Sequence, residues 1–203
     1  MSATIRPTWV HATILGTFCA GFGVALALTD DITKDPIKAR ALEDKMAALA
    51  LVIPKAIHDN NPVIDAVTLS GPEGKPVVIY RAMKGGTVTG VAYEMDASGG
   101  YGGPIKLMLG IDPQGKLLGV SVISHKETPG LGDKIDPAKT DWISRFTGLA
   151  LGNPPVEKWK VKKDGGQFDQ FSGATITPRA VVGGIRHGLE FFAENKPRMM
   201  EGK

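Results

Sequence analysis

"PIKLMLGIDPQGKLLGVSVIS", residues 104–124, is the stretch from which the fold of this chain can be worked out. Two apolar runs, 104–111 and 117–124, flank Asp112-Pro113-Gln114-Gly115, whose residue types are typical of a tight turn. Apolar runs of this length around such a turn predict two antiparallel strands. The stretch therefore predicts a β-hairpin.

Three more strand-like runs precede this hairpin, at 63–70, 76–83 and 87–95, and Gly, Pro, Asp and Asn clusters separate them. A short helix is expected over 140–149, with Thr140 or Asp141 as its cap. A longer helix is expected from Pro178 to about Glu194, with Thr177 as its N-cap and Pro178 in the first helical position. Strands followed by helices predict an α+β domain with a mostly antiparallel sheet.

Composition excludes several classes of protein. The formal charge of +3 over 203 residues is small and the lysines are spread along the chain, so no nucleic-acid surface is expected. Cys19 is the only cysteine, which rules out an intramolecular disulfide and a cysteine-based zinc or iron–sulfur site within this chain. The four histidines lack a metal-binding spacing, so we expect no metal site.

An uncharged run of 21 residues, 9–29, predicts a membrane-spanning helix, because roughly 30 Å of helix crosses a bilayer core. Arg6 precedes the run and Asp30 follows it, which places the amino terminus in the cytoplasm and the rest of the chain beyond the membrane. A cleaved signal peptide is the alternative, since Ala25-Leu26-Ala27 resembles a cleavage site. The run is longer than a usual signal core, which favours an anchor.

A second helix is expected from Asp35 to about Val52, with Pro36 in its first turn. It would link the anchor to the domain. The expected organisation is an anchor at 1–30, a helical linker at 31–62 and one folded domain at 63–203.

"SGATITP", residues 172–178, is the most informative of three glycine-rich loops. The free backbone N–H groups of the helix expected to follow it would favour a phosphate. Gly173 and Ala174 leave space for a bulky group beside the Thr175 hydroxyl. The spacing alone does not choose between Thr175 and Thr177, and a hydroxyl-rich loop that only caps a helix remains an alternative.

The other two loops are "SHKETPGLGDK" at 124–134 and "ASGGYGGPIKL" at 97–107. Pro129-Gly130 predicts a type II turn, and Gly132 allows a close backbone approach. The glycines around Tyr101 leave room for a ring. Either loop could also be a plain connection between elements.

Together with the single apolar span, the segments "GYGGPIKLMLG", "HKETPGLGDKI", "KKDGG" and "FDQFSGATITPRAVV" resemble the G subunit of the Rnf complex, an ion-translocating ferredoxin:NAD oxidoreductase. The resemblance covers nearly the whole chain. Its most specific element is D-x-x-S-G-A-T, the flavinylation motif that this family shares with the C subunit of the sodium-pumping NADH:quinone reductase. Asp169, Ser172, Gly173, Ala174 and Thr175 match it residue for residue.

The resemblance implies that Thr175 carries FMN through a phosphoester bond, attached after export by a magnesium-dependent flavin transferase that uses FAD. It implies that Asp169 serves recognition by this transferase. It also implies that the flavin lies near Ser172, Gly173 and Ala174 and near two loops, which contribute Glu127, Thr128, Pro129, Gly130, Leu131, Gly132, Tyr101 and Gly103.

The function implied is electron transfer within a membrane complex of the cell inner membrane, with the domain in the periplasm and the other Rnf subunits as partners. A phosphoester bond retains the flavin without altering its ring, so noncovalent surroundings would set its potential. Neither a catalytic residue nor a soluble substrate of this chain's own is expected. The alternatives are a C-type subunit of the quinone reductase and a membrane-anchored scaffold without flavin.

Overall fold

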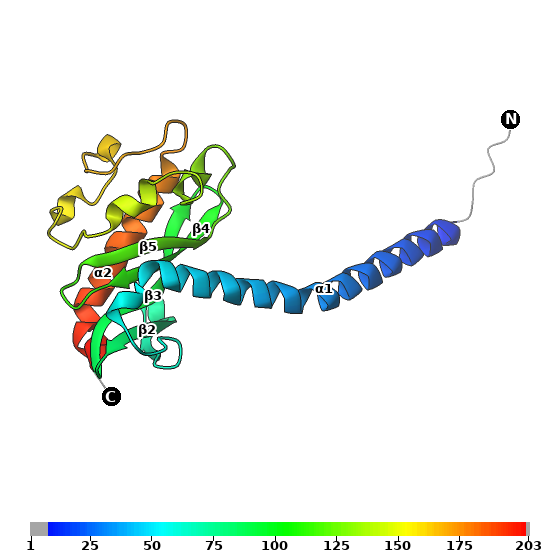
Figure 1. Ribbon diagram of the computed structural model, residues 1–203. Coiled ribbons are helices and arrows are strands. Elements are labelled where there is room, and N and C mark those ends of the chain that lie inside the picture. Colours follow the sequence, from blue (N-terminus) through cyan, green and yellow to red (C-terminus); the bar gives the residue numbers. More distant parts are fainter. Residues whose placement is uncertain (1–7, 202–203) are drawn as a thin grey trace. The chain divides into compact units, whose positions relative to one another are not determined.

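The computed structural model describes residues 8–201. The chain divides into two units, Met1–Asp44 and Lys45–Lys203, and each is considered by itself. The second unit holds a five-stranded sheet and the long helix α2 (Figure 1).

Helix α1 extends without interruption over Thr8–Val52. The prediction of a separate helix that begins at Asp35 is therefore wrong, because Pro36 lies inside α1. Proline lacks a backbone N–H, so this position lacks one helical hydrogen bond although the helix continues. Within the described residues α1 is the one helix long and apolar enough to cross a membrane. Arg6, on which the expected orientation rests, lies outside the described residues.

The sheet is antiparallel, as the sequence predicted, and it is a meander in which consecutive strands are neighbours. Its strands are β1 (Val67–Ser70), β2 (Pro76–Lys84), β3 (Thr87–Gly100), β4 (Gly103–Ile111) and β5 (Leu117–Ser124). The hairpin at 104–124 forms as expected, with Leu109 paired to Val120. β1 is shorter than expected, because residues 62–65 form a turn and the strand begins only at Val67, and β3 is longer.

Helix α2 spans Ile176–Met200, and the remaining helical segments are short 3-10 turns. The expected α-helix at 140–149 is one of these turns, Trp142–Phe146, and the Thr140 hydroxyl accepts a hydrogen bond from Trp142 N at 3.2 Å. The other 3-10 turns are Lys55–Ile57, Pro72–Gly74, Gly132–Ile135, Val156–Lys158 and Lys162–Asp164.

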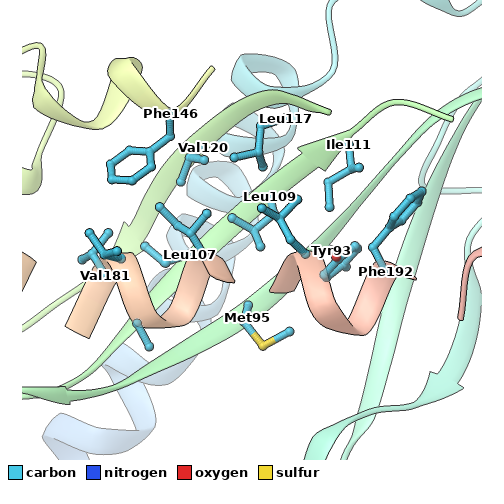
Figure 2. Packing of buried hydrophobic residues seen from close by; sticks show 14 of the residues in the cluster. Tyr93, Met95, Leu107, Leu109, Ile111, Leu117, Val120, Phe146, Val181 and Phe192 are labelled. Carbon is cyan, nitrogen blue, oxygen red and sulfur yellow. The ribbon is translucent and has the colours of Figure 1, made fainter. Parts of the chain in front are cut away.

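One face of the sheet packs against α2, which lies along β3 and β4. Figure 2 shows Leu107, Leu109 and Val181 in this core, and all three are fully buried. The Tyr93 hydroxyl donates to Gly188 O of α2 at 2.7 Å, and burial raises the pKa of Tyr93 well above its usual value. These contacts fix α2, and with it residues 175–177, relative to the sheet.

The opposite face of the sheet packs against the last turns of α1. Met108 points to this face, whereas its neighbours Leu107 and Leu109 point to α2, as the alternation of a strand requires. Gly110 and Gly119 are paired across β4 and β5, and Val52 lies against both. Both faces of β4 are thus buried, which explains why its sequence is almost continuously apolar.

An aromatic cluster holds the irregular segment between β5 and α2. Phe146 stacks on Phe168 with ring centroids 4.7 Å apart, and Trp142 meets Phe171 edge-on at 5.2 Å. Trp159 lies 5.2 Å from Phe168 and is almost fully buried. The cluster gives a segment with little regular structure a rigid course up to the start of α2.

Candidate functional site

The amino-terminal end of α2 lies two residues earlier than the sequence predicted. Thr175 is the N-cap residue, and its carbonyl accepts a hydrogen bond from Arg179 N at 3.2 Å. Thr177 and Pro178 are the second and third helical residues, so the prediction of Thr177 as N-cap is wrong. Pro178 remains within the first turn, where its missing N–H removes no helical hydrogen bond.

Thr177 is buried, with 1% of its surface exposed, and its hydroxyl donates a hydrogen bond to Glu127 Oε2. This contact explains why Thr177 does not cap the helix. No local pattern indicates it, because Glu127 and Thr177 lie 50 residues apart in the sequence.

Glu127 joins three segments of the chain. Its Oε1 accepts a hydrogen bond from Gly102 N at 2.9 Å, and its Oε2 accepts one from Tyr101 N at 3.3 Å and one from Thr177. Its own N–H donates to His125 Nδ1 at 3.1 Å. Glu127 is 5% exposed, so these donors take the place of the water that its buried carboxylate has lost.

The loop after β5 turns as the sequence predicted. Leu131 N donates to Thr128 O at 3.1 Å, and Gly130 has a φ of 78°, the conformation that a type II turn requires at this place. Gly132 then passes close to the Glu127 carboxylate. A Cβ at Gly132 would lie 2.6 Å from Thr177 Oγ1 and 2.7 Å from Glu127 Oε2.

A cavity of about 360 Å³ lies between these segments at the start of α2. Thr175 is half-buried at its edge, while Tyr101, Leu131 and Ile176 form an exposed apolar rim. The residues that line the cavity are Tyr101, Glu127, Thr128, Leu131, Gly132, Gly173, Ala174, Thr175, Ile176 and Thr177. Three loops that are far apart in the sequence therefore meet at one place.

Eight of the residues expected near a flavin line this cavity, and four do not. Ser172, Pro129, Gly130 and Gly103 lie in the same loops but outside the cavity lining. Ile176 and Thr177 also line the cavity; the sequence did not indicate Ile176, and Thr177 was expected to be the helix cap, because the helix was expected to begin later.

Asp169 lies apart from the cavity, on the surface next to the aromatic cluster. Lys162 Nζ is 2.6 Å from Asp169 Oδ1, and Arg145 Nη1 is 3.1 Å from Asp169 Oδ2. The hydrogen bond from Lys162 holds the pKa of Asp169 below its usual value. Its side chain is 47% exposed, so another protein can reach it.

Backbone groups at the start of α2 favour an anion, whereas the carboxylate of Glu127 disfavours one in the cavity. No Lys or Arg side chain of the described residues lines it. The free N–H groups and the positive dipole end of α2 are the features that favour a phosphate there. The first two of these N–H groups belong to Ile176 and Thr177, where the helix begins.

A larger groove of about 910 Å³ runs along α2 beside β3 and shares only Ile176 with the cavity lining. Polar and charged side chains such as Arg179, His187 and Glu190 line it. It lacks the threonine at a helix start, so we assign the candidate site to the smaller cavity.

Comparison with known proteins agrees with this geometry. Residues 100–190 match the family model of the FMN-binding domain, and this range includes every residue of the cavity lining. Three relatives are each named as the G subunit of an ion-translocating oxidoreductase complex. The one from Cereibacter sphaeroides is 48% identical over 191 residues, covering 94% of this chain and 87% of the relative.

The relative from Stutzerimonas stutzeri is 47% identical over 183 residues, covering 90% of this chain and 80% of the relative. The relative from Pseudomonas aeruginosa is 42% identical over 204 residues, covering 98% of this chain and 95% of the relative. The similarity therefore includes the helix α1 as well as the FMN-binding domain. The chain belongs to the family of Rnf ion-translocating oxidoreductase G subunits.

Proposed function

We propose that this protein is a membrane-anchored electron-transfer subunit of an ion-translocating oxidoreductase complex and carries FMN esterified to Thr175. The observation that carries the proposal is the half-buried Thr175 at the start of α2, beside a cavity within the FMN-binding domain. The names of the relatives support membership of the complex and favour it over a C-type quinone reductase subunit or a scaffold without flavin.

The contrast between the two threonines supports Thr175 as the attachment residue. Thr177 is 1% exposed and is held against Glu127, so burial keeps its hydroxyl oxygen from a phosphorus atom. Thr175 has no side-chain capping bond and lines the cavity. A phosphate on its oxygen would lie next to the free N–H groups of α2.

The attachment step transfers an FMN phosphoryl group from FAD. The bond between Thr175 Oγ1 and phosphorus forms, the pyrophosphate bond of FAD breaks, and AMP leaves. The proton of the Thr175 hydroxyl passes to a base of the flavin transferase. Asp169 is exposed and lies six residues before Thr175, which supports a role in recognition by that enzyme.

When bound, FMN supplies one- and two-electron transfer. The chain's own residues then retain and surround it: the ester prevents its loss, and the walls of the cavity limit its contact with water. The domain thereby relays electrons between other centres of the complex without a substrate or turnover of its own.

We further propose that α1 anchors the protein in the inner membrane, with the amino terminus in the cytoplasm and the FMN-binding domain in the periplasm. Retention by an ester has a physical reason there, since no pool of free FMN would reload an empty site. The organisation as anchor (1–30), helical linker (31–62) and domain (63–203) belongs to this proposal.

The test is to produce the full chain together with a flavin transferase and to examine the denatured protein for flavin fluorescence on a gel. Wild-type protein should fluoresce, and Thr175→Ala should not. Thr68→Val, which changes an exposed threonine of β1, is the matched control and should retain the fluorescence. A wild-type chain without bound flavin after exposure to the transferase would refute the proposal.

A further inference from the structure

The Glu127 side chain is hydrogen-bonded to two other segments that line the cavity, the Tyr101-Gly102 turn and the start of α2. Its Oε1 is engaged by Gly102 N, and its Oε2 by Tyr101 N and the Thr177 hydroxyl. Gly132 packs so closely on this carboxylate that even one added methyl group would overlap it. Both oxygens therefore serve the protein itself, which leaves little capacity to accept a hydrogen bond from a ligand.

The bond to Thr177 has a chemical consequence. To form a phosphoester, a hydroxyl must lose its proton and its oxygen must approach phosphorus. The Thr177 hydroxyl is held against Glu127 in the first turn of α2, and the residue is 1% exposed, so its oxygen cannot approach phosphorus. Thr175, two residues earlier, is half-buried at the edge of the cavity and is not restricted in this way.

The bonds to Tyr101 and Gly102 have a second consequence. They tie the turn between β3 and β4 to the start of α2, so the two walls of the cavity are held at a fixed distance. Loss of one hydrogen bond to a charged group in such a cluster weakens the others, because the buried carboxylate is left less well solvated.

We propose that Glu127 is a positioning residue that withholds the Thr177 hydroxyl from esterification and fixes the cavity walls, and thereby makes Thr175 the residue that receives FMN. This inference rests on the proposed function. It differs from the expectation of Glu127 as a flavin contact, since Glu127 acts here through Thr177 and the Tyr101-Gly102 turn.

The test uses the full chain in detergent with purified flavin transferase, FAD and Mg²⁺. Intact mass gives the rate of FMN attachment, measured at a temperature at which every variant is folded. Trypsin releases residues 164–179, which contain both threonines, so fragment ions on either side of Ile176 locate the ester. The visible circular dichroism and the midpoint potential of the attached flavin report whether the cavity walls keep their positions around it.

Glu127→Gln should lower the attachment rate by about tenfold, the loss expected when a charged hydrogen-bond acceptor becomes neutral. Thr177→Val, which removes the hydrogen-bond donor, should also lower the attachment rate. Thr177→Ser, which keeps a hydroxyl, should restore the rate. Both lowering variants should also shift the visible circular dichroism and the potential of the attached flavin. Glu157→Gln and Thr68→Val are the matched exposed controls and should match wild-type protein.

Flavin found on Thr177 in the Thr175→Ala variant would overturn the inference, because Glu127 would then not withhold that hydroxyl. A Glu127→Gln variant that attaches and holds flavin as wild-type protein does would overturn it as well. Failure of the proposed function can be distinguished from failure of this inference, because wild-type protein would then carry no flavin on either threonine.

Discussion

Gly132→Ala is the substitution whose effect can be worked out most directly from the structure. Its Cβ would lie 2.6 Å from Thr177 Oγ1, 2.7 Å from Glu127 Oε2 and 2.9 Å from Glu127 Cβ. Both neighbours are buried and hydrogen-bonded to each other, so neither can move without breaking that bond. Overpacking of this kind costs about 1–3 kcal/mol.

Urea unfolding of the full chain in detergent measures this loss. Trp142 and Trp159 are 5% and 2% exposed, so their fluorescence reports the unfolding of the domain. With a slope of about 2 kcal/mol per molar urea, a loss of about 2 kcal/mol lowers the midpoint by about 1 M. The displaced Glu127 should also slow FMN attachment to Thr175.

Gly130→Ala is the control, because it lies two residues earlier but outside the cavity lining. No atom lies within 4 Å of the Cβ that it would gain, and its cost arises from its φ of 78° alone. That strain is about 1–2 kcal/mol. The midpoint should therefore fall in both variants, whereas attachment should slow only in Gly132→Ala. Equal attachment rates in the two variants would refute the reasoning.

Three other perturbations have defined outcomes. The folded-state pKa of Asp169 lies below its ordinary value of about 4. Its bond to Lys162 therefore stabilises the domain above about pH 4, and this stabilisation is lost as the pH falls through the folded-state pKa. Asp169→Asn should remove this contribution to the pH dependence of the urea midpoint, measured between about pH 2 and pH 6. Gly110→Ala would place a Cβ 2.1 Å from Val52 O and should lower stability by about 1–3 kcal/mol, with faster hydrogen exchange in the last turn of α1. Phe146→Ala should lower the free energy of unfolding, measured with urea, by about 3–5 kcal/mol. A loss below about 1 kcal/mol would contradict the role of the aromatic cluster.

The strands were predictable because their patterns are local. The two apolar runs and the turn at 112–115 define the hairpin without any distant contact, and the other three runs are bounded by turn residues. The limits of the elements were less predictable. β1 begins later than its apolar run. Pro36 did not begin a helix, because the helical turns on both sides of it outweigh the one hydrogen bond that proline lacks.

The start of α2 shows where local rules fail. Thr177 before Pro178 fits the pattern of a helix cap, yet the helix begins at Ile176. The hydroxyl that was expected to bond its own backbone bonds Glu127 instead. A buried carboxylate requires donors more strongly than a helix end requires a cap, since the helix end can also be satisfied by water.

The sequence by itself determined the antiparallel sheet, the apolar amino-terminal helix and the D-x-x-S-G-A-T motif with its candidate Thr175, because each depends on residues close together in the chain. Only the tertiary structure decided that the loops at 101–102 and 127–132 meet the start of α2 around one cavity. It also showed a physical difference between the two threonines that the spacing alone does not give. Burial and a hydrogen bond across 50 residues separate Thr177 from Thr175, and no local pattern contains such a contact.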